Sequence, residues 1–274
     1  MKKLTEDEKV IIENLYREDS QSFKSIGRVI GRDYRTIKTY LESLGLQTKY
    51  QSVLQRKYLV KEDFFDDIDS EEKAYVLGFI YADGCNSIER NAVIINLKET
   101  DKDILLKITT LVQPTKPLMY IDTSEQIKKE GYENSKNQYR MVIQNKHISQ
   151  RLIELGCGKA KTHNLVFPTG IQVPKYLQRH FIRGYFDGDG SISGNKQKQF
   201  SITGNEKFLE SIQKILINDL YFSKTKLDKR WKDSKDNIKS LRYCGINQCI
   251  KFRDWLYKDA TLYLERKKEL FYSV

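Results

Sequence analysis

One short stretch of this sequence occurs twice. Residues 78–84 read GFIYADG and residues 184–190 read GYFDGDG, so the two copies are separated by 106 residues. Each copy is an apolar run that ends in a small residue, Asp and Gly, and each follows a segment with helical character. The repeat predicts two matched helices, each stopped by a Gly in the left-handed conformation that helix ends often adopt.

The two repeated helices are expected to pack against each other. Small residues recur four positions apart in each copy, so they lie on one helix face and let two backbones approach closely. Asp83 and Asp189 then emerge side by side at helix C-termini, where they repel each other and the helix dipole disfavours them. A divalent cation removes this conflict. Mg²⁺ takes one or two carboxylates together with phosphate oxygens, and bound metal can activate water for phosphodiester hydrolysis.

The two copies, VLGFIYADG at 76–84 and IRGYFDGDG at 182–190, resemble the motif of LAGLIDADG homing endonucleases. The resemblance runs roughly from residue 71 to the C-terminus. Because the motif occurs twice, this sequence is similar to the single-chain branch of the family, whose members contain two repeats and cut double-stranded DNA as monomers. The resemblance implies that Asp83 and Asp189 are metal-binding catalytic acids and that the carbonyls of Ala82 and Gly188 also contact metal.

One position departs from the pattern of the family. Tyr81 stands in the first copy where the second copy has Asp187. Because this position is not that of the catalytic acid, we expect the change to leave the metal site intact.

Composition favours a polyanionic partner. The chain has 274 residues, a formal net charge of +11 and a pI near 9.2, for which nucleic acid is the first expectation and a merely basic soluble protein the alternative. The four cysteines form no CxxC pair, which indicates free thiols in a reducing cytoplasm. No run approaches the roughly 18 apolar residues of a membrane span, and the N-terminus does not resemble a signal peptide.

Residues 1–46 are expected to form a separate DNA-binding domain. After a first helix at 5–17, residues 23–41 read as helix, tight turn at Gly31 and helix, with Ile26, Ile30, Ile37 and Leu41 as the shared apolar seam. This resembles a helix-turn-helix, whose second helix enters the major groove. Its expected DNA contacts are Arg32, Tyr34, Arg35, Thr36 and Lys38. The alternative is an ordinary helical hairpin with a solvated basic face.

The rest of the chain is predicted to be an α+β fold. After a linker at 47–70, residues 71–162 and 163–274 each follow the order αββαββα, so two four-stranded sheets should flank one pair of motif helices. The predicted strands lie at 85–89, 92–98, 117–121 and 138–144, and at 191–193, 198–203, 225–232 and 239–246. Residues 260–268 are expected to form a closing helix with a basic end.

Strand alternation assigns one polar, basic face of each sheet to DNA. Such faces suit the major groove, which admits a β-ribbon; a solvated sheet face is the alternative for any single residue. Arg242 is expected to occupy the place of Arg140 in the other repeat. The expected contacts are Asn96, Lys98, Arg140, Gln144, Gln199, Ser201, Thr203, Lys224, Lys226, Arg230, Lys232, Lys239 and Arg242.

A cation beside the acids completes the expected site. The family resemblance implies Lys or Gln near the end of the second or fourth strand, which corresponds to Lys98 and Lys146; a phosphate contact is the alternative role for each. The repeat, the charge and the family resemblance together predict a monomeric, Mg²⁺-dependent endonuclease that cuts a specific double-stranded DNA site, and the resemblance implies that the cut leaves 3′ overhangs. An intron-splicing maturase that binds RNA and a catalytically silent DNA-binding regulator are the alternatives. An intein is not expected, because splice-junction residues are absent from both ends.

Overall fold

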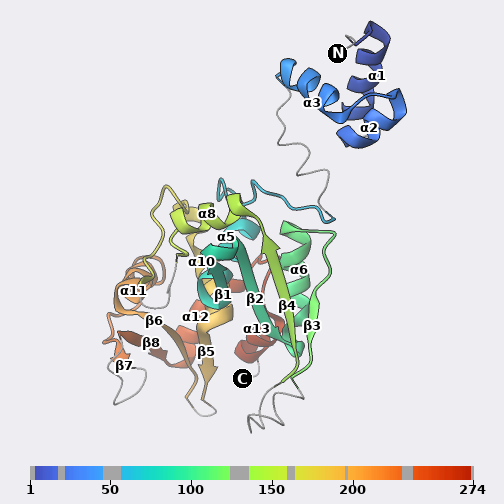
Figure 1. The fold of residues 1–274 in the computed structure, drawn as a ribbon. Helices are drawn as coiled ribbons and strands as arrows, with labels where there is room; N and C mark the ends of the chain where they lie inside the picture. The colour runs from blue at the N-terminus through green and yellow to red at the C-terminus, as the bar shows by residue number, and fades with distance from the viewer. Residues whose placement is uncertain are drawn as a thin grey trace. The chain divides into compact units, whose positions relative to one another are not determined.

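The computed structural model describes residues 4–17, 22–45, 57–123, 136–158, 164–194, 197–229 and 237–272. The chain divides into an N-terminal unit, residues 1–59, and a core unit, residues 60–274 (Figure 1). Across the described ranges, no helix is both long and apolar enough to cross a bilayer.

The described part of the N-terminal unit contains the short helices α1 (Glu6–Arg17), α2 (Phe23–Ile30) and α3 (Tyr34–Ser43). Gly31 ends α2 at φ 67°, a left-handed position that Gly occupies without strain. Gly27 packs against the turn and the start of α3, since a Cβ on it would lie 2.6 Å from the carbonyl oxygen of Arg32 and 3.5 Å from the backbone nitrogen of Tyr34. The predicted helix pair is therefore present: Ile26, Ile37 and Leu41 of the expected seam are buried together with Ile12 and Phe23, while Ile30 packs against them half-buried.

The core unit is organised around the two motif helices, α5 (Glu71–Asp83) and α10 (Gln178–Asp189). The two helices pack against each other at the centre of the unit (Figure 1). The central residues of both helices, 74–81 and 180–187, are buried, so the apolar runs read from the sequence form the core itself. The short 3₁₀ turn η3 (Lys175–Leu177) leads into α10.

Two antiparallel sheets of four strands flank this helix pair, in the orders β1-β2-β4-β3 and β5-β6-β8-β7. The predicted α+β duplicated fold is confirmed, and most predicted boundaries lie within a few residues of those observed. The first sheet comprises β1 (Gly84–Ser87), β2 (Ala92–Lys98), β3 (Met119–Ile121) and β4 (Gln138–Gln144); the second comprises β5 (Gly190–Ser193), β6 (Gln199–Asn205), β7 (Asp228–Lys229) and β8 (Ile238–Cys244).

The remaining helices cover the inner faces of the sheets. In the first repeat these are α6 (Lys102–Val112) and α8 (Lys146–Glu154), with the 3₁₀ turns η1 (Ile88–Arg90) and η2 (Glu99–Asp101) beside β2. In the second repeat they are α11 (Glu206–Leu220), α12 (Ile246–Tyr257) and α13 (Glu265–Tyr272). The predicted closing helix at 260–268 was therefore misplaced: the helix begins at Glu265, and residues 260–264 approach it in an irregular conformation.

The glycines that end the motif helices are needed for a reason other than the predicted one. Gly84 and Gly190 have φ of −77° and −85°, so both are extended and neither is left-handed. A Cβ on Gly84 would lie 2.8 Å from the side chain and carbonyl of Ile80, and one on Gly190 would lie 2.2 Å from the ring of Phe186. These glycines leave room for the chain to turn directly from helix into strand.

Strand alternation is confirmed, but one match between the repeats is wrong. Gly84 pairs with Ile95, and Gly190 pairs with Ile202, which aligns the two sheets. In this alignment Arg140 corresponds to Ser240, while Arg242 corresponds to Val142. The error arose because the chain between the second and fourth strands is shorter in the second repeat, so a constant offset does not carry from one repeat to the other.

Candidate functional site: paired acids at the crossing of α5 and α10

The two motif helices cross with their backbones in direct contact. A Cβ on Gly78 would lie 2.0 Å from the carbonyl oxygen of Phe181, and a Cβ on Gly184 would lie 2.0 Å from that of Tyr75. Neither position has room for a methyl group. The predicted close approach through small residues is therefore observed, and it is symmetrical about the crossing.

The same approach brings the ends of the two helices together. A Cβ on Gly188 would lie 2.3 Å from the Cβ of Ala82 and 3.1 Å from Oδ2 of Asp83, so the Asp83 carboxylate borders the residue next to Asp189. Both Asp side chains are exposed to solvent. Both also raise the pKa of Tyr185, whose hydroxyl is buried; burial is the larger cause. Asp83 and Asp189 therefore lie in the same environment, at the adjacent C-terminal ends of α5 and α10.

A buried lysine from α13 lies directly behind the acids. The Nζ of Lys267 donates to the carbonyl oxygens of Phe186 at 2.8 Å, Gly188 at 3.0 Å and Gly190 at 2.7 Å. An ammonium has three donors, and these bonds use all three. Burial lowers the pKa of Lys267 to about 8, against the opposing charges of Asp187, Asp83 and Asp189. Lys267 therefore holds the end of α10 and places positive charge under the acids.

Sequence reasoning missed Lys267. It lies in a basic run that reads as a solvated helix end, and no local pattern in the sequence distinguishes it from its neighbours.

Helix α13, which carries Lys267, is held to the first repeat by an ion pair. Arg266 donates from Nε and Nη2 to the two carboxylate oxygens of Asp101, both at 2.8 Å, and this pairing raises the pKa of the guanidinium. Asp101 is buried and lies immediately after β2. Such a bidentate pair fixes orientation as well as distance. It holds α13 across the crossing of the motif helices.

Of the two lysines expected beside the acids, only Lys98 lies at the end of its sheet that is near Asp83 and Asp189. Lys98 is exposed and closes β2, three residues beyond Ile95, which pairs with Gly84; this corresponds to about 10 Å along the strand. Lys146 begins α8 at the far end of β4. Its neighbour His147 contacts Asp66, which precedes the N-terminus of α5. The structure does not bring Lys146 to the acid pair.

The oxygen atoms of the two carboxylates are suitable ligands for a hard divalent cation. Two exposed carboxylates supply oxygen ligands, and Mg²⁺ completes its shell with water and phosphate oxygens. Among the described residues, no cluster of three or more His, Cys, Asp or Glu side chains forms a closed metal cage. The Gly188 carbonyl, expected as a metal contact, accepts a hydrogen bond from Lys267 here, while the Ala82 carbonyl remains a predicted contact.

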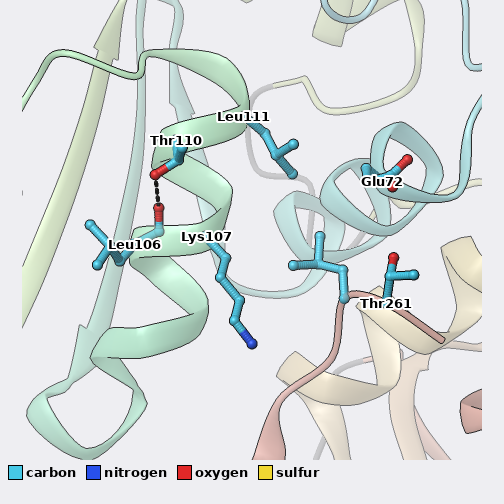
Figure 2. A pocket seen from close by; sticks show the side chains of 7 residues that line it. Glu72, Leu106, Lys107, Thr110, Leu111 and Thr261 are labelled. Atoms are coloured by element: carbon cyan, nitrogen blue, oxygen red, sulfur yellow. Dashed lines mark hydrogen bonds between the residues drawn. The ribbon is translucent and has the colours of Figure 1, made fainter.

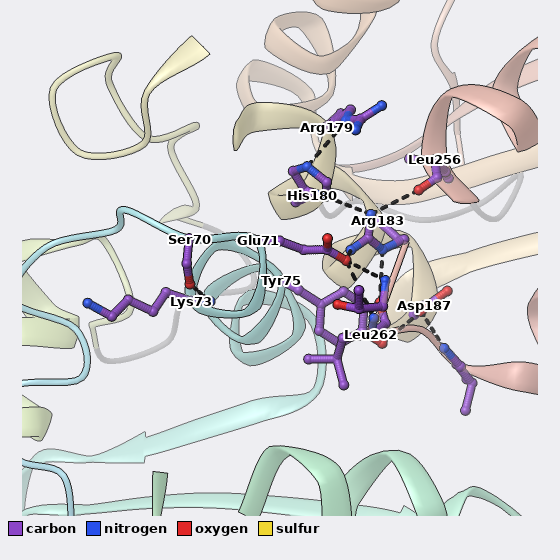
Figure 3. A network of polar contacts seen from close by, with 12 residues as sticks. Ser70, Glu71, Lys73, Tyr75, Arg179, His180, Arg183, Asp187, Leu256 and Leu262 are labelled. Carbon is purple, nitrogen blue, oxygen red and sulfur yellow. Dashed lines mark hydrogen bonds and ion pairs between the residues drawn. The ribbon is translucent and has the colours of Figure 1, made fainter. Parts of the chain in front are cut away.

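A second polar network, which includes Asp187 and Arg183, is buried against the motif helices (Figure 3). Asp187 accepts hydrogen bonds from the hydroxyls of Tyr75 and Tyr257 at 2.7 and 2.6 Å and from the backbone N–H of Leu264 at 2.7 Å. Burial raises the pKa of Asp187 against these bonds. Tyr81, its counterpart, donates to the carbonyl of Leu155 instead. The departure from the motif at Tyr81 therefore lies in the packing and outside the acid pair.

Arg183 is the largest fully buried side chain of this network. It donates to the carboxylate of Glu71 at 2.6 Å, to the carbonyls of Leu256 and Leu262, both at 2.9 Å, and to Nδ1 of His180 at 2.8 Å. Burial and then Arg183 lower the pKa of His180 to about 4. The network ties the segment that precedes α13 to both motif helices.

The outer faces of the sheets carry most of the predicted DNA contacts. Asn96, Lys98, Arg140 and Gln144 lie on the outer face of the first sheet, and Gln199, Ser201, Thr203 and Arg242 on that of the second. Lys224 and Lys226 are exposed in the segment before β7. Lys239 is half-buried in β8 on the side of Leu241 and Tyr243, so it does not lie on this face. Arg230 and Lys232 lie outside the described residues.

In the N-terminal unit, the predicted contacts divide into two kinds. Arg32 donates to both carboxylate oxygens of Glu8, at 2.8 and 3.0 Å, so it connects the turn to α1. Tyr34, Arg35 and Lys38 are exposed on α3, and Thr36 is half-buried. The exposed three are available to a partner, whereas Arg32 is engaged within the unit.

A pocket elsewhere in the core unit takes no part in the site. It has a volume of about 380 Å³ and lies between α6, the start of α5 and residues 261–262 (Figure 2). Glu72, Lys107 and Leu111 line it. Glu72 precedes Asp83 by eleven helical residues, which is about 16 Å along α5. The pocket therefore lies at the other end of the motif helix.

The sheets and the central helix pair define the fold as that of LAGLIDADG homing endonucleases. The structure of the homing endonuclease I-WcaI bound to its DNA recognition sequence is similar, with a TM-score of 0.52 and 12% identity, over 76% of this chain and 91% of that chain. Other similar structures are the N-terminal LAGLIDADG domain of DUF199/WhiA (TM-score 0.45, 16% identity, 76% and 93% covered) and meganuclease I-AabMI bound to uncleaved DNA (0.43, 15%, 72% and 86%).

Sequence comparisons add a match confined to part of the chain. Residues 177–254, which include the second motif copy, match the family described as LAGLIDADG-like domain. A probable translation initiation factor IF-2 of Methanocaldococcus jannaschii is 24% identical over 186 residues, which cover 66% of this chain. This chain spans only 14% of the length of that factor.

Proposed function

We propose that this protein is a site-specific endonuclease that hydrolyses both strands of a DNA duplex. The observation that supports this most strongly is the delivery of two exposed carboxylates, Asp83 and Asp189, to one place by helices whose backbones touch. A regulator that only binds DNA has no need of paired, solvent-facing acids that repel each other. Because both acids come from one chain, the enzyme acts as a monomer.

Each residue of the site has a distinct role in binding or cleaving DNA. Asp83 and Asp189 hold Mg²⁺, which when bound activates water and stabilises the leaving oxygen of a phosphodiester. Lys267 fixes the end of α10 and offsets the repulsion between the acids. Lys98, on the strand that ends beside this region, contacts a phosphate. The outer sheet faces bind the duplex in the major groove, and α3 of the N-terminal unit adds contacts through Tyr34, Arg35 and Lys38.

Cleavage of a randomised library of 40-base-pair duplexes in Mg²⁺, followed by sequencing of the ends, tests this proposal. We expect a defined set of cut sites with 3′ overhangs. The Asp83→Asn and Asp189→Asn variants are each expected to abolish double-strand cleavage while retaining duplex binding. Asp103→Asn, which changes an exposed acid on α6, serves as the matched control and should cut normally.

The alternative functions predict different results for duplex binding, duplex cleavage and intron splicing. Tight duplex binding with no cleavage in any divalent metal would identify a silent regulator. Rescue of intron splicing by the purified protein, without duplex cleavage, would identify a maturase. Undiminished cutting by either Asp variant would exclude the assigned catalytic acids.

A further inference from the structure

The outer faces of the two sheets differ in chemistry at equivalent positions. In the first sheet, Cys85 pairs with Ile94, and Ile94 pairs with Val142. Directly paired residues of adjacent strands place their side chains on the same face. Cys85 is exposed, and Ile94 and Val142 are half-buried on the side of the sheet opposite to the buried Val93, Ile95 and Leu97. These three residues form an apolar row across three strands, which we call the methyl row.

The equivalent row of the second sheet is polar. There Ser191 pairs with Ser201, and Ser201 pairs with Arg242. The difference extends to the edge strands: Met119, which is 52% exposed, pairs with Arg140 in the first sheet, whereas Asp228 pairs with Ser240 in the second. Duplicated halves that bound the same bases would not need such different faces.

The residues that flank the methyl row indicate what covers it. Two residues along β2 and β4, Nε of Arg140 donates to Oδ1 of Asn96 at 2.7 Å. This bond orients the guanidinium and leaves its terminal amino groups for another partner. Lys98 and Gln138 follow in the next row. An apolar strip bordered by an oriented arginine, an amide and a lysine complements a major groove, where thymine presents a methyl group and guanine presents two acceptors.

We propose that the methyl row reads thymine methyl groups, so that the half-site under the first sheet requires thymine while the half-site under the second does not. This inference rests on the proposed binding of duplex DNA by the sheets. Arg140 binds a guanine in the same half-site. Two residues along a strand span about 6.8 Å, and base pairs rise about 3.4 Å, so this guanine lies about two base pairs from the thymine. The target is therefore asymmetric.

Binding measured without cleavage separates this inference from the nuclease proposal. Duplexes that bind the full chain in Ca²⁺ are selected from the randomised 40-base-pair library. Each thymine of the consensus is then replaced by deoxyuridine, which lacks only the methyl group. We expect affinity to fall about fourfold per methyl at the thymines of one half-site, the factor for exposing one buried methyl group. Deoxyuridine in the other half-site should have no effect.

A reciprocal pair of variants assigns the effect to the row. Ile94→Ser should make binding insensitive to deoxyuridine, and Ser201→Ile should create a new thymine preference in the other half-site. Because both positions face outward, neither change disturbs the core, and circular dichroism confirms folding. Methyl-sensitive binding in Ca²⁺, with no cleavage of the same duplexes in Mg²⁺, would support this inference and reject the nuclease. Methyl-insensitive binding would overturn this inference alone. Absence of duplex binding, with or without self-association through this face, would overturn both.

Discussion

The α carbon of Gly78 lies so close to the carbonyl of Phe181 that an added methyl group would come within 2.0 Å of its oxygen. Contacts of this kind fix how far apart the two motif helices lie, and therefore how far apart their terminal acids lie. The position of Asp83 relative to Asp189 depends on residues that contribute no chemistry of their own.

Gly78→Ala and Gly184→Ala should each destabilise the core unit by about 3 kcal/mol or more, because backbone atoms on the facing helix must move. Urea denaturation of the full chain measures this. Gly158→Ala is the matched control, since no atom lies within 4 Å of its added Cβ. A control-like effect at Gly78 would mean that the helices are not in backbone contact.

Lys267→Met should reduce duplex cleavage by at least about 100-fold, the cost of a misplacement of about 1 Å at a reacting centre, because the end of α10 that carries Asp189 loses the hydrogen bonds that fix it. Duplex affinity should change little, because Lys267 is buried. Lys268→Met tests the neighbouring charge, which lies over the ring of Tyr263, and should cut normally. Equal losses for the two variants would indicate a general charge effect instead of a specific role for Lys267.

Tyr75→Phe and Tyr257→Phe should each cost about 1.5–3 kcal/mol of folding free energy, as expected for a hydrogen bond to a charged group. Each change removes one donor from the buried Asp187 carboxylate. Tyr176→Phe alters an exposed ring and should have an effect near zero. Chemical denaturation compares the three, and negligible losses at Tyr75 and Tyr257 would show that Asp187 is protonated or solvated.

His180 should make the core unit sensitive to acid. Its pKa is about 4 when folded and 6.5 in the unfolded chain, so between these values only the unfolded state binds the proton. Its contribution to stability is complete above pH 6.5 and is lost as the pH falls to about 4. Glu71, Glu72, Arg179 and Arg183 surround it.

The His180→Gln variant checks that contribution. Urea midpoints at pH 7 and pH 5 should converge in this variant relative to the wild type. His147→Gln, at an exposed imidazole beside Asp66, should retain the wild-type difference. An unchanged pH dependence in His180→Gln would assign the acid sensitivity to other groups.

Arg32 and Arg35 should have separable roles in the N-terminal unit. Arg32→Ala removes the pairing with Glu8 and should speed amide hydrogen exchange in α1, measured on the full chain. Arg35→Ala should leave exchange in α1 unchanged and weaken duplex binding, with a shallower dependence on salt. If Arg35→Ala binds duplex as well as the wild type, α3 does not contact DNA.

The sequence predicted those features that depend on local periodicity. The alternation of Val93, Ile95 and Leu97 in β2 assigned the inner face correctly, because one side of a sheet must be buried. The repeated small residues predicted the helix crossing, because close backbone approach excludes bulk. Motif spacing predicted that Asp83 and Asp189 belong together.

The features that sequence reasoning missed depend on contacts between distant segments. Lys267 reaches the acids from 78 residues beyond Asp189, and nothing local distinguishes it from the solvated lysine beside it. Arg183 interrupts an apolar run, yet it is fully buried, because Glu71 and two carbonyls from the C-terminal segment surround it. The misassigned partner of Arg242 reflects unequal connections between strands.

The ion pair between Glu71 of α5 and Arg183 of α10 joins the two repeats and requires one copy of each. The offset of 106 residues places Leu177 at the position of Glu71 in the second repeat and Leu77 at the position of Arg183 in the first. Two copies of the second half would bury two Arg183 guanidinium groups without the Glu71 carboxylate that accepts their hydrogen bond here, and two copies of the first would leave Glu71 without its arginine. The two halves are therefore complementary at this ion pair, and a homodimer of either half alone would lack it.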